Sequence, residues 1–293
     1  MKVLIVGGVA GGASAAARLR RLDETAEIIL FERGEYVSFA NCGLPYYIGN
    51  VITNRESLLV VTKEMLQNRF RLDIRTNCEV ISIDRAGKKV KVRDSVTNNE
   101  YEESYDKLVL SPGAAPLRPP LPGVNGSRIY TLRNIPDTDA IRKVVDGGTV
   151  RSATVVGGGF IGIEMAENLK HRGVDVTLVE MLPQVMAPLD IEMAAIVHQH
   201  LKLKGVHLAL GDGVAGFEEK EQRVTTSLTS GQKVESDIVI LAIGVKPEIK
   251  LAVEAGLETG KGIVVNNEMQ TSDPDIYAVG DAVEIKDFQT GSQ

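Results

Sequence analysis

The same sequence pattern occurs twice in this chain, and it constrains the fold more than any other feature. KVLIVGGVAGGASAAARLRRL stands at residues 2–22, and ATVVGGGFIGIEMAENLKHRG stands at residues 153–173. Each copy has a short apolar run, a glycine cluster and a helix-like segment, followed by a second apolar run that ends in Glu32 or Glu180. This order predicts a strand, a glycine turn, a helix and a second strand, which together form a dinucleotide-binding unit.

The residue types of this pattern suit a bound pyrophosphate. Glycines permit a tight turn and let the pyrophosphate approach backbone N–H groups at the helix N-terminus, where the helix dipole favours anions. The acid at the end of the second strand can accept hydrogen bonds from ribose hydroxyls. It follows the first glycine by 25 positions (32 − 7) and by 23 positions (180 − 157). We therefore predict two bound dinucleotides, the alternative being two glycine-rich turns in an ordinary α/β domain.

The two copies differ in detail. The glycines of the second copy are Gly157, Gly159 and Gly162, and those of the first are Gly7, Gly11 and Gly12. Val9 stands where the first copy would have its middle glycine. Met181 follows Glu180, so no arginine directly after this acid would bind a 2′-phosphate, and the second copy favours NADH over NADPH.

Length and charge narrow the class of protein. A chain of 293 residues is longer than most single domains and predicts two. Its formal net charge of −6 offers no basic face for nucleic acid, and no apolar run is long enough to span a bilayer. The N-terminus lacks the pattern of a signal peptide, so we expect a cytoplasmic protein with no membrane partner. Two cysteines do not form a disulfide scaffold.

Other segments complete the domain plan. The stretches CEVISIDR, KKVKVRD and ESYDKLVLS alternate apolar and polar residues and predict an antiparallel meander. Residues 112–124, rich in proline and glycine, predict an interdomain linker. Near the C-terminus a strand at residues 276–279 runs into Gly280 and Asp281, which places a carboxylate at the ligand-binding edge of a parallel sheet.

Taken together, these motifs resemble the pyridine nucleotide-disulfide oxidoreductase family. The resemblance rests on GGVAGGASAAARLRRL, SFANCGLPYYIG, LVLSPGAAP, VVGGGFIGIEMAENL, LAIGVKP and TSDPDIYAVGDA, in the order in which the family has them. It implies an α/β fold of two Rossmann-like domains of the three-layer ββα type, with the NAD domain inserted in the FAD domain. The expected limits are 1–113 and 248–293 for the FAD-binding domain and 114–247 for the NAD(P)H-binding domain.

The resemblance also assigns cofactor-binding residues. For FAD it implies Gly7, Ala10, Gly11, Gly12, Glu32, Arg33, Asn41, Val80, Ser111, Gly113, Arg133 and Asp281. For NADH it implies Gly157, Gly159, Phe160, Ile161, Gly162, Glu164, Glu180 and Gly244, with NADPH the less favoured nucleotide. Phe160 matches an aromatic residue that shields the flavin until nicotinamide displaces it, and Glu164 would orient the nicotinamide amide. No metal is expected.

Cys42 is the expected catalytic residue. Backbone donors at a helix N-terminus favour a thiolate, and Cys42 precedes an apparent helix start. Most reductases of the superfamily have a second cysteine five positions on, but position 47 here is Tyr47, so that internal disulfide is excluded. The resemblance is to the single-cysteine branch of the family. Cys78, the other cysteine, is interpreted as a filler of a half-buried strand.

The expected substrate is a disulfide or persulfide, with coenzyme A as the thiol that carries the substrate sulfur. Peroxidases and water-forming oxidases of this branch carry a histidine where Ala10 stands, and its loss removes the proton donor expected for peroxide cleavage. Ser14, Arg18 and Arg21 share one helix face, where arginines would bind the phosphates of coenzyme A. Ser38 and Asn41, which flank the thiol, would position its pantetheine end.

The sequence therefore predicts an FAD-dependent oxidoreductase. Electrons would pass from NADH via FAD to Cys42, which reduces a small-molecule disulfide or persulfide: CoA disulfide, CoA persulfide or polysulfide. The alternatives are an NADH oxidase that reduces oxygen and a non-catalytic nucleotide-binding fragment. The latter arises because family members continue into a C-terminal dimerisation domain, whereas this chain stops soon after Asp281. Full-length relatives are expected to be homodimers, and a monomer stays open for this chain.

Overall fold

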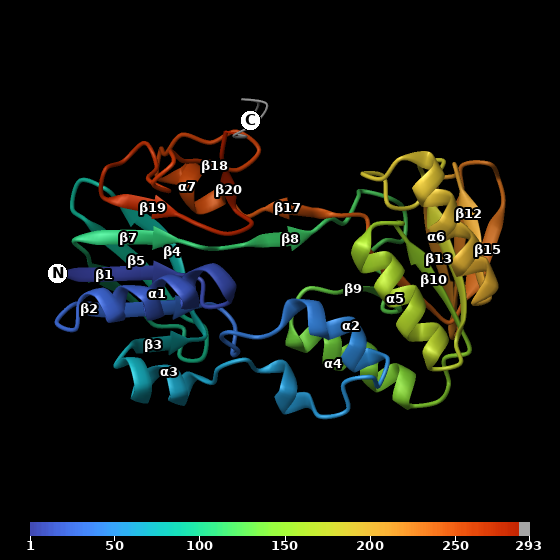
Figure 1. Ribbon diagram of the computed structural model, residues 1–293, viewed down its shortest axis with the longest axis horizontal. Coiled ribbons are helices and arrows are strands. Elements are labelled where there is room, and N and C mark those ends of the chain that lie inside the picture. Colours follow the sequence, from blue (N-terminus) through green and yellow to red (C-terminus); the bar gives the residue numbers. More distant parts are fainter. Residues whose placement is uncertain (287–293) are drawn as a thin grey trace. The chain divides into compact units, whose positions relative to one another are not determined.

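The computed structural model describes residues 1–286, and residues 287–293 of the expected segment 248–293 lie outside the described residues. The chain forms two compact units (Figure 1). Unit 1 comprises Met1–Phe39, Leu59–Ala115 and the chain from Pro247 onward, and unit 2 comprises Ala40–Leu58 and Pro116–Lys246. Within residues 1–286 no helix is both long and apolar enough to cross a membrane.

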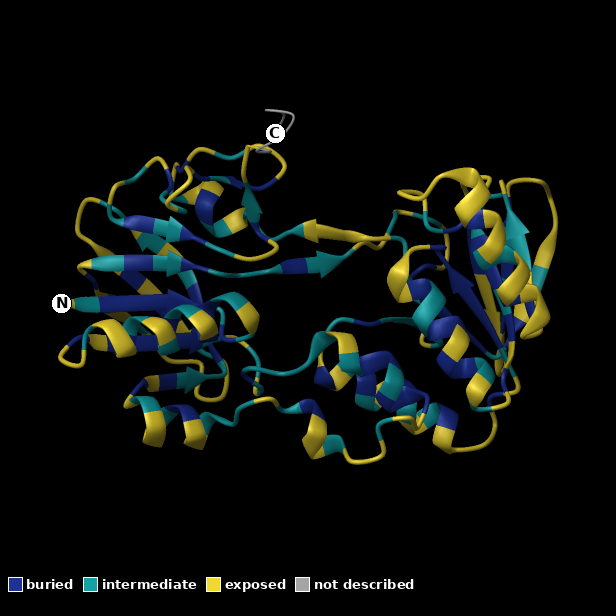
Figure 2. Ribbon diagram, in the orientation of Figure 1, coloured by how far each residue is buried: buried dark blue, intermediate teal, exposed yellow. Residues whose placement is uncertain are grey.

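Unit 1 is built on a five-stranded parallel sheet with the order β19-β7-β1-β2-β3. Its strands are β1 (Lys2–Val6), β2 (Glu27–Glu32), β3 (Asp73–Thr76), β7 (Lys107–Leu110) and β19 (Ile276–Ala278). Helix α1 (Ala10–Leu22) connects β1 to β2, and α3 (Lys63–Phe70) precedes β3. The apolar runs of β1 and β2 are buried over nearly their whole length, as expected for the centre of a parallel sheet (Figure 2).

Unit 2 repeats this plan with the strand order β12-β11-β10-β16-β9. Its strands are β10 (Ser152–Val156), β11 (Asp175–Glu180), β12 (Val206–Leu210), β16 (Ile238–Leu241) and β9 (Ile129–Thr131). Its helices are α2 (Leu44–Ile48), α4 (Ile135–Asp146), α5 (Phe160–His171) and α6 (Ile191–Leu203). The edge strand β9 precedes the repeated pattern, whereas its counterpart β19 in unit 1 comes after it. Both units are thus dinucleotide-type α/β folds, as predicted.

Each unit also contains a three-stranded antiparallel meander. In unit 1 it consists of β4 (Cys78–Asp84), β5 (Lys89–Asp94) and β6 (Glu100–Ser104), and in unit 2 of β13 (Val214–Lys220), β14 (Arg223–Leu228) and β15 (Lys233–Ser236). The sequence prediction ran the third strand of the first meander on into LVL. The structure separates the two, because Asp106 interrupts the run and β7 pairs in parallel with β1.

Short elements complete the chain. They are the 3₁₀ helices η1 (Asn41–Gly43) and η2 (Arg55–Leu58), the strands β8 (Ala114–Pro116), β17 (Val245–Pro247), β18 (Ile263–Val264) and β20 (Val283–Glu284), and helix α7 (Lys250–Glu254). Strands β8 and β17 pair where the chain passes between the units, within or beside the segments LVLSPGAAP and LAIGVKP.

A hydrophobic core in unit 1 joins its sheet to its meander and to the segment after Pro247. Buried side chains of β1, β2, β4, β5, β7 and β19 meet there with Ala252, Leu257 and Ile263. Cys78 belongs to this core, and burial raises the pKa of its thiol. The prediction that Cys78 is a packing residue is therefore confirmed.

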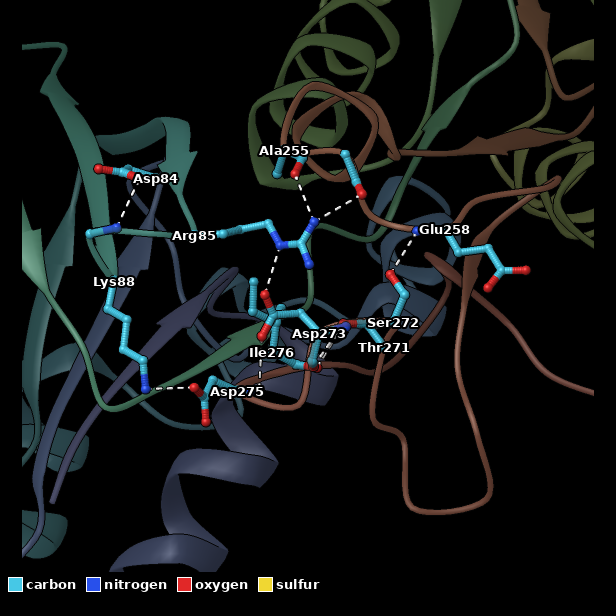
Figure 3. A network of polar contacts seen from close by, with 12 residues as sticks. Asp84, Arg85, Lys88, Ala255, Glu258, Thr271, Ser272, Asp273, Asp275 and Ile276 are labelled. Atoms are coloured by element: carbon cyan, nitrogen blue, oxygen red, sulfur yellow. Dashed lines mark hydrogen bonds and ion pairs between the residues drawn. The ribbon is translucent and has the colours of Figure 1, made fainter.

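Polar contacts hold the C-terminal segment of unit 1 to the β4–β5 turn (Figure 3). Arg85 donates from Nε to Asp273 Oδ2 at 2.7 Å and from Nη1 to the carbonyl oxygen of Gly256 at 3.0 Å. Lys88 pairs with Asp275 at 2.5 Å, and Lys107 pairs with the same carboxylate at 2.6 Å. The segment that carries β19 and Asp281 is thereby fixed to the rest of its unit.

Residues 40–58 do not belong to the unit in which the expected domain limits place them. The sequence analysis assigned them to the FAD-binding domain, within 1–113. The structure places them in unit 2, because α2 packs against α4 and α5. The other two changes of unit, after Ala115 and after Lys246, lie within two residues of the expected limits at 113 and 247.

Candidate functional site: two glycine loops and the Cys42 segment

The first glycine loop connects β1 to α1. Gly7 has a φ of +97°, which favours glycine, and a Cβ there would overlap the carbonyl oxygen of Ser111. A Cβ on Gly12 would overlap the carbonyl oxygen of Gly7, so α1 approaches the end of β1 as closely as backbone allows. A Cβ on Gly11 would lie 2.7 Å from Ser111 Oγ. These three predicted residues and Ser111 thus lie together.

The second loop connects β10 to α5 and has the same geometry at both ends. Gly157 has a φ of +109°, and a Cβ there would overlap the carbonyl oxygen of Ala242. A Cβ on Gly162 would overlap the carbonyl oxygen of Gly157. The middle residue, Gly159, lies at the N-cap of α5, and a Cβ there would meet no atom within 4 Å. The loop therefore leaves open space in front of its helix N-terminus.

The two acids occupy equivalent positions at the ends of β2 and β11. Glu32 accepts hydrogen bonds from the backbone N–H groups of Gly8 and Gly34, each at 2.8 Å. Glu180 accepts from those of Gly158 at 2.6 Å and Leu182 at 2.8 Å. Each carboxylate thus holds its glycine loop against the second strand, and its remaining lone pairs can accept ribose hydroxyls.

The other residues assigned to FAD that are described next belong to unit 1, except for Arg133. Gly113 has a φ of +74°, and its carbonyl oxygen accepts from Glu248 N at 2.9 Å in unit 1. Val80 is 7% exposed, with its side chain in the core, so only its backbone is available to a ligand. Arg33 Nη2 donates to Glu248 Oε1 at 3.1 Å. Asp281 is exposed in unit 1, whereas Arg133 belongs to unit 2.

The residues assigned to NADH surround the second loop. Phe160 and Ile161, 67% and 36% exposed, begin α5 and leave their side chains free to meet a ligand. Glu164, one turn on, is half-buried, and burial followed by repulsion from Glu167 raises the pKa of its carboxyl. Gly244, with a φ of +114°, is exposed beyond β16.

Cys42 lies in η1, directly before α2, and its side chain is exposed. Tyr47, at the position of the family's second cysteine, is 9% exposed within α2. The neighbouring Asn41 has a buried Oδ1 that accepts no hydrogen bond from residues 1–286. A buried acceptor without a donor is unfavourable in a folded protein, so Asn41 Oδ1 is suited to accept from a ligand.

The predicted helix face on α1 is present. Ser14, Arg18 and Arg21 are exposed, and the Arg21 guanidinium lies 5.9 Å from the centroid of the Phe70 ring. Arg69 lies over the same ring at 5.6 Å. The intervening Arg20 is buried and donates to the carbonyl oxygens of Phe70, Arg71 and Glu24, which makes it a structural residue. Ser38, with a φ of +49°, lies in unit 1 next to the crossing to Ala40.

Sequence analysis missed the partners of the cysteine segment within unit 2. Arg142 of α4 and Arg172, the residue after α5, both donate to carbonyl oxygens of α2. Burial raises the pKa of the Tyr46 phenol, and the nearby carboxylates of Glu164 and Glu167 raise it further.

The comparisons with known proteins agree with this geometry. The chain is 38% identical to an NADH oxidase of Methanocaldococcus jannaschii, covering 100% of this chain and 65% of the relative. It is 38% identical to a coenzyme A disulfide reductase of Staphylococcus haemolyticus, covering 96% of this chain and 63% of the relative. The chain thus spans just under two thirds of the length of these curated relatives.

Solved structures match equally well. The reduced CoADR-RHD of Bacillus anthracis is 55% identical with a TM-score of 0.97, over 99% of this chain and 52% of that chain. A NAD-dependent persulfide reductase from A. fulgidus is 37% identical with a TM-score of 0.96, over 100% of this chain and 55% of that chain. The sequence profile described as "Pyridine nucleotide-disulphide oxidoreductase" matches residues 1–293, and the chain belongs to this family of redox enzymes.

Proposed function

We propose that this chain is the electron-transferring part of an NADH-dependent flavoprotein that reduces a CoA disulfide, a CoA persulfide or a polysulfide at Cys42. One observation carries the proposal: a single exposed cysteine, with Tyr47 at the place of its usual partner, in a chain with two dinucleotide loops. Without an internal disulfide partner, the second sulfur has to come from the substrate.

The residues of both loops fit the nucleotides proposed for them. For FAD, unit 1 offers the amides of the Gly7–Gly12 loop to the pyrophosphate and Glu32 to the ribose. For NADH, unit 2 offers the open space at Gly159 and the carboxylate of Glu180. The flavin, when bound, supplies two-electron transfer between a nicotinamide and a disulfide. Glycines that admit no Cβ support this assignment in both loops.

The chain's own contribution to the reaction centres on Cys42. Its thiolate attacks one sulfur of a disulfide R–S–S–R, forming Cys42–S–S–R while one R–S⁻ leaves and is protonated by solvent. Two electrons that originate in NADH then cleave this bond, restoring the Cys42 thiolate and releasing the second R–S⁻. In total one NADH and one proton convert one disulfide into two thiols and NAD⁺. Asn41 Oδ1, a buried acceptor, is placed to orient a donor group beside the thiol.

The exposed face of α1 supports coenzyme A as the carrier of the substrate sulfur. Arg18 and Arg21 are free of salt bridges to described residues, and guanidinium groups bind phosphates through paired hydrogen bonds. Ser14 stands on the same face. The similarity to a coenzyme A disulfide reductase favours the same substrate class.

A second candidate is an NADH oxidase that reduces oxygen, which the similarity to the Methanocaldococcus protein favours. Against it stands Ala10, which offers no proton donor in the first glycine loop.

Anaerobic turnover tests the proposal. The flavin-loaded protein is mixed with NADH and, in separate reactions, CoA disulfide, CoA persulfide, polysulfide and hydrogen peroxide, and oxygen uptake is followed in air. We expect fast NADH consumption with one of the sulfur substrates and its loss in Cys42→Ser, whereas Cys78→Ser serves as the matched control and retains it. Turnover that is fastest with peroxide or oxygen, or that survives in Cys42→Ser, contradicts the proposal.

A further inference from the structure

The segment that carries Cys42 is held by the helices of unit 2. Residues Ala40–Leu58 cluster with this unit, and α2 packs against both α4 and α5. Gly49, which ends α2, abuts Asn168 of α5 so closely that a Cβ would overlap the Asn168 Oδ1. At its far end the segment is tied to α4 by Arg55, which donates to both carboxylate oxygens of Asp139 at 2.7–3.1 Å.

Arg142 of α4 binds the end of α2 in three ways. Its guanidinium carbon lies 3.9 Å from the centroid of the Tyr47 ring, within the range of a cation–π contact. Its Nη1 donates to the carbonyl oxygen of Tyr47, and its Nη2 donates to Asn50 Oδ1 at 2.9 Å. The side chain is only 15% exposed. A planar fork that stacks and donates at once cannot be replaced by a lysine without loss of contacts.

Arg172 binds the next carbonyl from α5. Its Nη1 donates to the carbonyl oxygen of Ile48 at 2.9 Å, and its Nη2 donates to Asp146 Oδ1 at 2.6 Å. The other oxygen of Asp146 accepts from Arg142 Nε at 3.2 Å. Although burial alone would raise the pKa of Asp146, its hydrogen bond and ion pair with Arg172, then Arg142, lower it overall. One carboxylate therefore joins the two arginines that hold α2.

Helix α5 links this clamp to the nucleotide loop. It begins at Phe160, directly after Gly159, and Arg172 follows its last residue, His171. Because α5 is one continuous helix, it is a rigid element of the kind that can carry coupling from its N-terminus to Arg172. Arg172 in turn contacts the carbonyl of Ile48, six positions after Cys42. A continuous series of contacts within unit 2 therefore leads from the Gly157–Gly162 loop through α5 and Arg172 to the segment that carries Cys42.

We propose that Arg142 and Arg172 are positioning residues that couple dinucleotide binding at the Gly157–Gly162 loop to the reactivity of Cys42. The inference rests on the proposed function, in that the loop takes NAD(H) and the Cys42 thiol is the reacting group. It adds that the second unit binds the nucleotide and also sets the position of the thiol that uses its electrons. A conformational equilibrium of the clamp that both sites bias is what such coupling requires.

The test measures the thiol directly and needs no turnover. The flavin-loaded protein, in a Cys78→Ser background, is alkylated with iodoacetamide with and without saturating NAD⁺, and the rate is followed by intact mass. We expect NAD⁺ to change the alkylation rate by about fivefold or more, which is the lower range of measured couplings between sites. Alkylation of Cys42 should also change the dissociation constant of NAD⁺; the size of that change is measured separately, because reciprocity holds for binding free energies and not for rates.

Substitution of the clamp should abolish both effects. In Arg142→Lys and Arg172→Lys we expect the NAD⁺ effect on alkylation to fall below about twofold, with NAD⁺ still bound, because the glycine loop is untouched. Arg128→Lys is the matched control, since Arg128 of unit 2 donates to the carbonyl oxygen of Asp237 and makes no described contact with residues 40–58. Asp146→Asn, which loosens both arginines and keeps their guanidinium groups, replaces either lysine variant that fails to fold.

The outcomes separate this inference from the proposed function. An unchanged alkylation rate with NAD⁺ in the parent protein, or a full NAD⁺ effect in folded clamp variants, overturns the coupling. If Cys42→Ser abolishes disulfide turnover in that case, the proposed function stands without it. If instead coupling is observed but no sulfur substrate is reduced, the coupling stands and the proposed substrate is wrong.

Discussion

The glycine loops of the two units share their first and last glycines but differ at three positions between them. Gly7 and Gly157 have positive φ, and Gly12 and Gly162 pack against them without room for a Cβ. In between, Val9-Ala10-Gly11 of unit 1 stands opposite Gly159-Phe160-Ile161 of unit 2. The shared glycines are required by the backbone conformation and packing of the loop. The three residues that differ between the loops indicate how the surroundings of each loop differ.

The middle position shows that the missing glycine of unit 1 is no defect. Val9 has a φ of −90° and Gly159 a φ of −78°, so neither needs a left-handed conformation. The position occupied by Gly11 in unit 1 and by Ile161 in unit 2 differs in its surroundings. A Cβ on Gly11 would lie 2.7 Å from Ser111 Oγ and 3.1 Å from Val279, whereas Ile161 is exposed. Residues of unit 1 itself thus lie close to its loop at Gly11, whereas the equivalent position of unit 2 is open to solvent. This difference is compatible with the different nucleotides proposed for the two loops.

The largest effects are expected at the shared glycines. Gly12→Ala and Gly162→Ala each force a methyl group against a carbonyl oxygen, and such overpacking costs about 1–3 kcal/mol of unfolding free energy. Gly12→Ala should lose the flavin absorbance band, and Gly162→Ala should keep it while the KM for NADH rises. Thermal denaturation, absorbance and steady-state kinetics measure these changes. Loss of the flavin in both variants, or in neither, would show that the loops are not specialised as proposed.

A smaller effect is expected at the residue after each acid. In unit 1 Arg33 follows Glu32, and in unit 2 the exposed Met181 follows Glu180. Met181→Arg supplies a cation for a 2′-phosphate, so the ratio of kcat/KM for NADPH to that for NADH should rise about tenfold, or about 1.4 kcal/mol. Leu203→Arg adds the same charge elsewhere on unit 2 and should leave the ratio unchanged. An equal ratio in both variants argues against nucleotide binding beside Met181.

The middle position should respond weakly and in one loop only. Because a Cβ on Gly159 meets no protein atom, Gly159→Ala should leave the free energy of unfolding within about 0.5 kcal/mol of its original value. It should nevertheless raise the dissociation constant of NADH, since the methyl group enters the open space. Val9→Gly should leave flavin content unchanged. A destabilised Gly159→Ala protein with normal NADH binding would refute the view that this space is for a ligand.

The smallest expected effect is the contribution of Glu164, in unit 2, to the pH dependence of the free energy of unfolding. Glu164 corresponds to the uncharged Ser14 of unit 1, and burial with Glu167 nearby raises its pKa in the folded protein. The folded state then holds a proton more readily than the unfolded state, so the Glu164 contribution favours folding less as pH rises above about 4.5. Glu164→Gln should reduce this decline, and Ser14→Ala should not. Urea denaturation between pH 4 and 7 measures both; parallel curves for Glu164→Gln and the parent protein exclude this contribution.

Much of the fold followed from the sequence because local signals agree with the tertiary structure. The repeated strand–glycine–helix–strand pattern predicted β1, α1 and β2 in unit 1 and β10, α5 and β11 in unit 2. The spacing to Glu32 and Glu180 identified the acids that hold each loop. The end of the first meander was misjudged because ESYDKLVLS was interpreted as one strand, whereas Tyr105 and Asp106 separate β6 from β7. Pairing of LVL with β1 is a long-range choice that no local pattern reveals.

The surroundings of Cys42 were the harder part of the site. The roles proposed for its sequence neighbours Asn41 and Tyr47 could be inferred from the amino-acid sequence alone. Arg142 and Arg172 are about a hundred residues away or more, the first in α4 and the second directly after α5, where an arginine ordinarily faces solvent. Only packing of α2 against α4 and α5 brings them to its carbonyl oxygens, and this same packing places residues 40–58 in unit 2.

The most direct test of the account is a count of electrons. Flavin-loaded protein is treated with CoA disulfide, freed of excess reagent and titrated anaerobically with NADH, in parallel with Cys42→Ser. If Cys42 holds the second sulfur as a mixed disulfide, the parent protein should consume about two equivalents of NADH per flavin and release about one equivalent of CoA thiol. Cys42→Ser should consume about one equivalent and release no thiol. The same consumption in both proteins would contradict the central claim that Cys42 carries electrons from the nucleotides to a sulfur substrate.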